Sequence, residues 1–323
     1  MSQVPQQFDN RPVSLRTAIR ERTIRMDANR YLQEKKEIVD SALERYFPRE
    51  EEFPSNLYKA MQYSLFAGGK RIRPILSIAS FEAVGGRGER ILPFACALEM
   101  IHTYSLIHDD LPAIDNDDYR RGKPTCHKVF GEAIAILAGD GLLTEAFRLM
   151  TNQPAKDCPS SDEGLVLDLI NEVARAAGVF GMVGGQVADV ESERKVVDLS
   201  AVQYIHTHKT AAMILASVRV GAKLGGAKEE ILKALTRYGE SLGLAFQIVD
   251  DILNVEGKAS LMGKKTGSDL SKGKATYPSV LGVEESKRRA KELGRLGVDA
   301  LKQFGPEAEP LREIARFVIA RGY

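Results

Sequence analysis

The sequence has few cysteines, no long apolar run and almost no net charge, and each absence excludes a class of protein. Cys96, Cys126 and Cys158 lie far apart, form no C-x-x-C pair and follow no secretory signal sequence, which favours a reducing cytoplasmic location. No apolar segment approaches the ~20 residues that cross a bilayer, so we expect no membrane span. A formal net charge of +1 lacks the basic field of nucleic-acid-binding proteins, so nucleic acid is not an expected partner.

Helical periodicity dominates the 323 residues, of which 44% are hydrophobic. Apolar residues three and four positions apart predict helices near 27–47, 55–67, 72–84, 91–111, 129–152, 163–183, 199–224, 228–255, 284–304 and 308–321. No alternating pattern of comparable quality predicts strands. We therefore expect an all-α fold, a single bundle of about ten helices. Residues 1–26 are expected to form a flexible N-terminal arm, and residues 27–323 one domain.

An acidic cluster follows the apolar segment from Pro93 to Ile107. Residues 107–124 read IHDDLPAIDNDDYRRGKP and hold five aspartates within ten positions. A solvated acidic loop is one interpretation. A metal site is the alternative, because carboxylates that leave water beside one another need a compensating cation. Oxygen ligands without a His/Cys cluster favour Mg²⁺ over zinc.

A second acidic pair, Asp250 and Asp251, interrupts the apolar helix LAFQIVDDILNVEG, in which Asn254 shares a helix face with Asp250. One such pair could belong to a structural network. Two pairs, each at the end of an apolar helix, predict two walls of one metal site. Mg²⁺ held by few carboxylates completes its coordination with water and phosphate oxygens, so the implied substrate is a phosphate or diphosphate.

Basic residues that suit such a substrate occur in several segments. In FAGGKRIRP, Gly68 and Gly69 would let the backbone approach an anion, and the charges would come from Lys70, Arg71 and Arg73. Further cations in DDYRRGKPT, in HTHKT and in the loop 256–278 are Arg120, Arg121, Lys209, Lys264 and Lys274. The two arginines either pair with the acidic cluster or reach phosphate. The lysine-rich loop is either a mobile cationic lid or a solvated loop.

Taken together, these motifs resemble one protein family. GGKRIRP, HTYSLIHDDLPAID, DDYRRGKPT, GGQVADV, HKT and FQIVDDILN occur in the order and spacing found in the trans-prenyl diphosphate synthases. The resemblance runs from about residue 27 to the C-terminus and is strongest to the short-chain branch, which makes farnesyl or geranylgeranyl diphosphate. It implies an isoprenoid synthase fold, a large all-α bundle around a central active-site cavity, and commonly a homodimer.

The resemblance also implies a reaction. About three Mg²⁺ ions per active site, together with basic groups, draw diphosphate from an allylic substrate such as dimethylallyl or geranyl diphosphate. The double bond of isopentenyl diphosphate attacks the carbocation in a 1'-4 condensation, and a proton is lost to the released diphosphate. No nucleophilic side chain is needed, because electrostatic stabilisation and positioning accelerate the reaction.

Individual residues receive roles from the same resemblance. The metal ligands would be Asp109, Asp115 and Asp250. Isopentenyl diphosphate would be bound by Lys70, Arg73, His102 and Arg121, and the allylic diphosphate by Arg120, Lys209, Lys264 and Lys274. The groups closest to catalysis would be Lys209, Thr210 and Gln247, the last two with dipoles near the developing cation. His206 and His208 are interpreted as structural.

Product length is expected to depend on Tyr104, five residues before Asp109 and about 7.5 Å away along a helix. The farnesyl-making branch carries an aromatic residue at this position, so farnesyl diphosphate is the expected product and geranylgeranyl diphosphate the alternative. Tyr104 could instead be an ordinary core aromatic with its hydroxyl satisfied.

One position departs from the family pattern. Asn254 occurs where the second motif usually ends in Asp, which removes a charge and predicts weaker metal affinity. The departure leaves open a non-catalytic subunit of a heteromeric synthase, although the complete first motif and the basic residues argue against it. A terpene cyclase is a further alternative, but cyclases of this fold usually carry an Asn/Ser/Glu triad and lack the isopentenyl diphosphate site.

Overall fold

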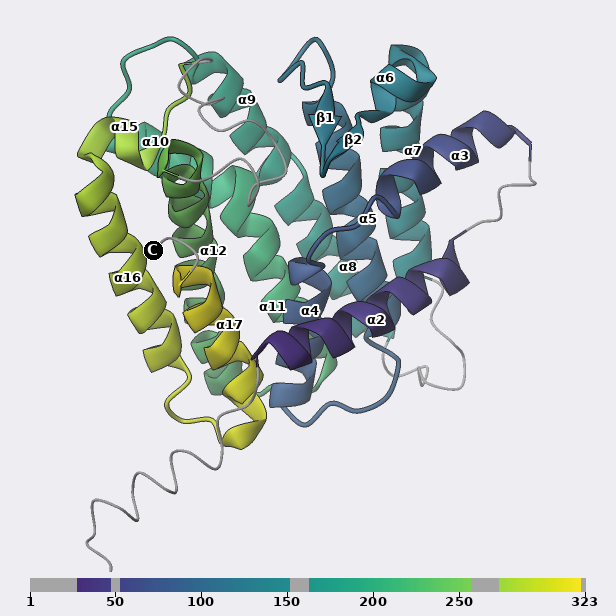
Figure 1. Cartoon of the computed structure of the whole chain (residues 1–323). Coiled ribbons are helices and arrows are strands. Elements are labelled where there is room, and N and C mark those ends of the chain that lie inside the picture. Colours follow the sequence, from purple (N-terminus) through teal and green to yellow (C-terminus); the bar gives the residue numbers. More distant parts are fainter. Residues whose placement is uncertain (1–27, 48–52, 152–162, 257–272, 321–323) are drawn as a thin grey trace, which may run out of the picture.

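The structure, a computed structural model, describes residues 28–47, 53–151, 163–256 and 273–320 (Figure 1). Within these ranges the chain is mostly helical, and its strands β1 and β2 are only two residues each. The prediction of an all-α bundle is confirmed. The expected N-terminal arm lies outside the described residues. None of the helices in these ranges is long and apolar enough to cross a membrane.

The first half of the bundle contains helices α2 to α8. Their bounds are α2 Ala28–Tyr46, α3 Ser55–Leu65, α4 Ile72–Ala83, α5 Leu92–Asp109, α6 Cys126–Phe130, α7 Glu132–Thr151 and α8 Glu163–Ala177. Between α5 and α6, the strands β1 (Tyr119–Arg120) and β2 (Lys123–Pro124) pair as an antiparallel hairpin.

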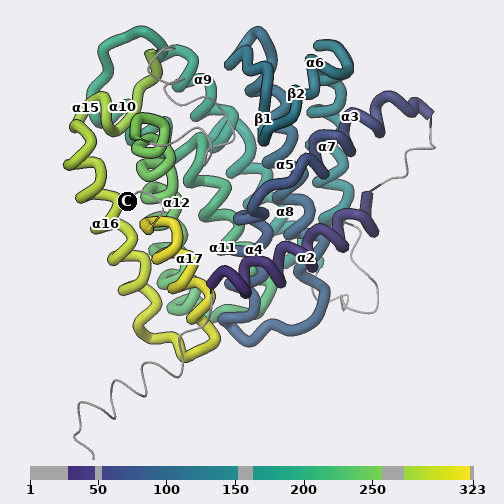
Figure 2. Tube along the Cα trace, in the orientation of Figure 1, coloured from purple at the N-terminus to yellow at the C-terminus, as the bar shows by residue number. Residues whose placement is uncertain are grey.

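The second half begins at α9. Its elements are α9 Met182–Ser192, α10 Leu199–Ile205, the π-helical segment η2 His206–Ala211, α11 Ala212–Leu224, α12 Glu229–Glu256, α15 Tyr277–Leu281, α16 Val283–Ala300, the 3₁₀ turn η3 Pro306–Ala308 and α17 Glu309–Ala320. Figure 2 shows α15 and α16 on one side of the molecule and α3, α6 and α7 on the other, with α11 between them.

The first half of helix α5 lies in the core because, apart from Glu99, its residues are all apolar. Every residue from Leu92 to Ile101 is buried, and a helix that is apolar all round must be covered on all sides. It packs against α2, α3, α4 and α7. Helix α4 in turn packs against α11, where a Cβ on Gly221 would lie 2.0 Å from the Ser77 carbonyl oxygen, so glycine permits the close approach. This packing fixes where the polar end of α5 emerges.

Two helices differ from the sequence expectations. The predicted helix 163–183 ends at Ala177, and α9, which has no counterpart among the predicted helices, begins at Met182. The break follows from Gly181, where a Cβ would lie 2.0 Å from the Ala176 carbonyl oxygen. The predicted helix 199–224 contains the π-helical η2, a local widening that often occurs at functional sites. Both α9 and η2 carry side chains of the cavity described below.

Candidate active site

The first acidic motif begins where α5 ends. The helix stops at Asp109, before Pro112, and the chain turns back so that the Asp115 N–H donates to the Asp109 carbonyl oxygen at 2.8 Å. The turn places the two carboxylates close enough to influence each other. Burial raises the pKa of Asp109; Lys209 opposes this shift and the charge of Asp115 adds to it. A bound cation would relieve the repulsion.

The neighbouring Asp110 is paired within the protein. Its carboxylate, 5% exposed, accepts hydrogen bonds from Arg120 Nε at 2.8 Å and Nη2 at 2.6 Å. Arg121 has a left-handed backbone with φ of +53° and donates from Nη1 to the Gly68 carbonyl oxygen. The side chains of the two adjacent arginines therefore make different contacts: Arg120 binds the acidic cluster, and Arg121 binds the glycine turn at Gly68.

Arg73, His102 and Arg121 make a basic wall beside this turn. A Cβ on Gly69, whose φ is +128°, would lie 2.7 Å from the Arg121 guanidinium, so glycine is required there. Burial, followed by the charges of Arg73 and Arg121, lowers the pKa of His102 well below its ordinary value. Arg73 Nε has no hydrogen-bond partner among the described residues. The wall thus carries positive charge suited to an anion, and Lys70, the residue after Gly69, is exposed.

Arg71 is not part of the basic wall. Its side chain is 1% exposed and donates to Glu99 Oε1 at 2.7 Å and to Asp40 Oδ1 at 2.8 Å. Its backbone φ is +53°, which turns the chain just before α4 begins at Ile72. The interpretation of Arg71 as a cation for the substrate is therefore wrong: this side chain anchors the glycine turn in the core.

The second acidic motif lies on α12. Asp250 lines the cavity. Asp251 is 3% exposed and accepts hydrogen bonds from Gln247 Nε2 at 3.0 Å and from the Tyr277 N–H at 2.9 Å. Asn254 is 2% exposed and does not line the cavity that the described residues enclose. The departure from the family pattern therefore falls away from the cavity surface.

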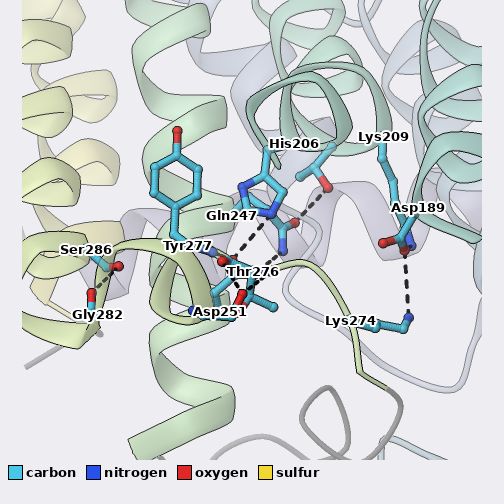
Figure 3. A network of polar contacts seen from close by, with 12 residues as sticks. Asp189, His206, Lys209, Gln247, Asp251, Lys274, Thr276, Tyr277, Gly282 and Ser286 are labelled. Atoms are coloured by element: carbon cyan, nitrogen blue, oxygen red, sulfur yellow. Dashed lines mark hydrogen bonds and ion pairs between the residues drawn. The ribbon is translucent and has the colours of Figure 1, made fainter. Parts of the chain in front are cut away.

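Two lysines reach across the site to acidic side chains (Figure 3). Lys209 Nζ, on η2, lies 2.6 Å from Asp189 Oδ2. Lys274 Nζ, just before α15, lies 2.7 Å from Asp115 Oδ1 and 3.8 Å from Asp189 Oδ2. Lysines from two segments thus neutralise carboxylates from two others.

Sequence reasoning left Asp189 without a role. It lies on α9 within GGQVADV, a segment noted only as part of the family resemblance. One turn earlier, a Cβ on Gly185 would lie 2.2 Å from the backbone nitrogen of Lys209, so this glycine lets α9 touch η2. The sequence feature that could have identified Asp189 is the glycine one helical turn before it. A glycine at that spacing lets the acidic residue approach a neighbouring helix closely.

A cavity of about 440 Å³ joins these groups. The predicted site residues that line it are Arg73, His102, Tyr104, Asp109, Asp115, Arg120, Lys209, Thr210, Gln247, Asp250 and Lys274. Thr210 Oγ1 donates to Gln247 Oε1 at 2.7 Å. Lys70 and Arg121 do not line this cavity within the described part of the chain, and Lys264 lies outside the described residues.

The donor set fits magnesium held jointly with a ligand. All the candidate ligands are carboxylate oxygens, which Mg²⁺ prefers. Among the described residues, no three acidic, histidine or cysteine side chains form a ready-made metal cage. Mg²⁺ commonly binds one or two protein carboxylates and takes its other ligands from water and phosphate. Asp109, Asp115 and Asp250 would therefore hold it together with a phosphate-bearing substrate.

Comparison with known proteins places the chain in a family. The polyprenyl synthetase model matches residues 54–301. The chain is 53% identical over 298 residues to a farnesyl diphosphate synthase from Geobacillus stearothermophilus, covering 92% of this chain and 99% of that protein. It is 49% identical over 292 residues to a geranylgeranyl diphosphate synthase from Cyanophora paradoxa, covering 90% and 95% respectively.

A solved structure shows the same fold. A geranyltransferase from Helicobacter pylori, complexed with magnesium and isoprenyl diphosphate, superposes with a TM-score of 0.81 at 31% identity, covering 92% of this chain and 99% of that chain. The chain therefore belongs to the polyprenyl synthetase family and is a prenyltransferase.

Proposed function

We propose that this chain is a short-chain trans-prenyl diphosphate synthase that condenses isopentenyl diphosphate with dimethylallyl and geranyl diphosphates. Its main product is farnesyl diphosphate. The observation that carries the proposal is a cavity in which two acidic motifs face lysines and arginines and which continues to the ring of Tyr104. The family and the named relatives support the same reaction class.

Each wall of the cavity has a task in this reaction. The allylic diphosphate is bound by Arg120, Lys209 and Lys274, with Lys264 from the sequence assignment. Isopentenyl diphosphate binds at the basic wall of Lys70, Arg73, His102 and Arg121. About three Mg²⁺ ions, held by Asp109, Asp115 and Asp250, would supply the charge that stabilises the leaving diphosphate. The dipoles of Thr210 and Gln247 face the developing carbocation.

The ring of Tyr104 favours the C15 product over the C20 product. Tyr104 is 7% exposed, lines the cavity on the α5 wall, and meets His108 edge to face with ring centroids 5.6 Å apart. A ring held in this way would stop a growing chain. Geranylgeranyl diphosphate synthase is the alternative. A non-catalytic subunit of a heteromeric synthase is disfavoured, because Asp109, Asp115 and Asp250 line the same cavity as Arg73 and His102.

The proposal is tested by product analysis. Purified protein is incubated with isopentenyl diphosphate and, separately, dimethylallyl, geranyl or farnesyl diphosphate, with Mg²⁺ or with EDTA, and the products are identified by mass. We expect farnesyl diphosphate from the first two substrates, little product from the third, and no turnover in EDTA. Mostly C20 product would move the assignment to the alternative, and turnover in EDTA would exclude metal-assisted ionisation.

We also propose that the protein is a homodimer. The supporting feature is a group of exposed apolar side chains on the neighbouring helices α6 and α7, formed by Val129, Ile136 and Leu137, which are 47%, 43% and 53% exposed. None of these three side chains lines the cavity that the described residues enclose. An exposed apolar face of this kind commonly marks an interface. Light scattering at several concentrations should give twice the mass of the chain, and Leu137→Glu should shift the protein towards monomer; a wild-type monomer would overturn the idea.

A further inference from the structure

The two aspartates of the second acidic motif have different surroundings. Both side chains line the cavity, but Asp250 is half-buried, whereas donors converge on the buried carboxylate of Asp251 (Figure 3). Oδ1 accepts from Gln247 Nε2 at 3.0 Å, and Oδ2 accepts from the Tyr277 N–H at 2.9 Å. His206 Nε2 lies 3.3 Å from the same Oδ2. Donors from three directions require a side chain that only accepts, which an ionised carboxylate does and an amide does not.

His206 and Tyr277 reinforce this contact. The His206 side chain is 4% exposed, and its ring stacks on that of Tyr277 with centroids 5.2 Å apart and planes 23° apart. Burial lowers the pKa of His206 to about 3, so the ring is neutral and carries one N–H. Nδ1 has no hydrogen-bond partner in the described part of the chain. The N–H is therefore best placed on Nε2, towards Asp251.

The backbone that Asp251 binds leads directly to Lys274. Tyr277 is the first residue of α15, and Thr276 caps that helix. At the other end of this short segment, the Gly273 carbonyl oxygen accepts from the Arg194 N–H at 3.0 Å. The segment from Gly273 to Tyr277 is thus held at both ends, with Lys274 between the two attachments and its Nζ at Asp115.

We propose that Asp251 is a positioning residue: its carboxylate fixes the start of α15 on α12 and thereby sets where Lys274 stands opposite Asp115. The two aspartates of the second acidic motif then have different roles. Asp250 would hold the metal ion, and Asp251 attaches the segment that carries Lys274 to the first acidic motif. The role of Lys274 towards the allylic diphosphate rests on the proposed function, whereas the attachment of α15 does not.

Asp251→Asn tests the attachment first. The substitution keeps the shape of the side chain but turns an N–H towards donors, so the bond to the Tyr277 amide is lost or weakened. Hydrogen exchange is followed by mass spectrometry on peptides that cover Lys274 to Leu281, in protein free of metal and substrate. We expect exchange at least about tenfold faster in these peptides than in wild type, without change in α5 peptides. Unchanged exchange at Tyr277 would overturn the proposal.

Kinetics then distinguish a positioning residue from a metal ligand. For Asp251→Asn we expect the KM for geranyl diphosphate to rise about tenfold or more, with the KM for isopentenyl diphosphate and the Mg²⁺ concentration for half-maximal rate within about twofold of wild type. The matched control, Asp250→Asn on the same helix, should show the reverse: a raised Mg²⁺ requirement and unchanged exchange at Tyr277. A raised Mg²⁺ requirement in Asp251→Asn, or an unchanged KM for geranyl diphosphate, contradicts the proposal.

A second pair of variants keeps the test decisive if Asp251→Asn folds poorly. His206→Phe keeps a flat ring against Tyr277 but removes the N–H, and His206→Gln keeps an N–H donor. We expect His206→Phe to raise the KM for geranyl diphosphate and the exchange rate at Tyr277, each by about threefold or more, and His206→Gln to restore both in part. Equal behaviour of the two variants would mean that the contact to Asp251 does not position α15. Because exchange is measured without substrate, this outcome is separate from any failure of the proposed reaction.

Discussion

The buried carboxylate of Asp109 lowers the stability of the folded, metal-free protein. Burial raises its pKa above the ordinary 3.8, so the folded state holds this proton more tightly than the unfolded chain does. The favourable contribution of this carboxyl to the free energy of unfolding is fully present below its pKa in the unfolded chain, and it is lost as pH rises through its pKa in the folded protein. At neutral pH the ionised carboxylate therefore destabilises the metal-free protein.

Substitution of this one residue should separate activity from stability. In Asp109→Asn we expect the activity to fall by about 100-fold or more, because a proposed metal ligand is lost, and the melting temperature in EDTA to rise. Calorimetry in EDTA and a condensation assay measure the two effects. Asp140→Asn is the control, since the Asp140 side chain is 59% exposed, and it should change neither quantity. A lower melting temperature for Asp109→Asn would show that burial does not govern this carboxylate.

His102 predicts a pH dependence of anion binding. Burial and two neighbouring arginines, Arg73 and Arg121, keep its pKa well below the ordinary 6.5 in the free protein. A diphosphate beside the basic wall cancels those charges and raises the pKa of His102, so binding takes up a proton and tightens as pH falls towards that raised value. Titration calorimetry with isopentenyl diphosphate in buffers of different ionisation enthalpy should detect an uptake of protons that changes as the pH is lowered. His102→Asn should abolish it; equal uptake in that variant would assign the proton elsewhere.

At the scale of elements, the contact of α9 with η2 depends on Gly185. A methyl group there would lie 2.2 Å from the Lys209 backbone nitrogen, so Gly185→Ala must push the two elements apart and separate Asp189 from Lys209. We expect a loss of about 1–3 kcal/mol in the free energy of unfolding and a marked loss of activity. Gly164→Ala is the control: a Cβ on this glycine of α8 would meet nothing within 4 Å, and the change should stabilise by about 0.5–1 kcal/mol. Urea unfolding measures the free energy of unfolding of both variants. Equal changes in the two would show that the contact of α9 with η2 does not depend on Gly185.

The start of α4 depends on the buried ion pair between Arg71 and Glu99. Arg71→Ala leaves Glu99, whose side chain is 2% exposed, without its ion-pair partner in the core, and should cost about 3–5 kcal/mol in the free energy of unfolding. Arg45→Ala removes an arginine whose side chain is 51% exposed and which pairs with Glu89 at 3.2 Å, and should cost at most about 1 kcal/mol. Denaturant unfolding compares the two. A small effect at Arg71 would mean that water reaches Glu99.

For the whole molecule, the depth of the cavity sets the size of the product. Tyr104→Ala removes the ring from the α5 wall, and we expect a shift from C15 towards C20 and longer diphosphates, measured by chromatography and mass. Tyr63→Ala is the control, because Tyr63 is an aromatic residue outside this cavity, with its hydroxyl bonded to the Pro124 carbonyl oxygen. The same products from Tyr104→Ala and wild type would show that another residue limits chain growth.

The architecture was predictable because strong signals in the sequence agree. Apolar periodicity predicted the helices, and like charges beside apolar segments pointed to the ends of α5 and α12, which the structure brings to one cavity. The opposite directions of Arg71 and Arg73 were not predictable, because they depend on one left-handed residue before α4. Nor was the contact between His206 and Asp251, since a pair distant in sequence and joined through a π-helical turn leaves no periodic pattern.

The pairing of Lys274 with Asp115 makes the ligands of the site dependent on one another. Before any ligand arrives, this cation and this carboxylate already satisfy each other at 2.7 Å. A metal ion bound at Asp115 would weaken the hold of this carboxylate on Lys274, and a diphosphate bound at Lys274 would weaken the hold of this lysine on Asp115. Because each ligand would weaken a contact that competes with the other, we expect the two to bind cooperatively, and thermodynamic linkage then requires that each tightens the other by the same factor. A metal ion or a diphosphate alone would meet opposite charges that are already paired, and would therefore bind weakly.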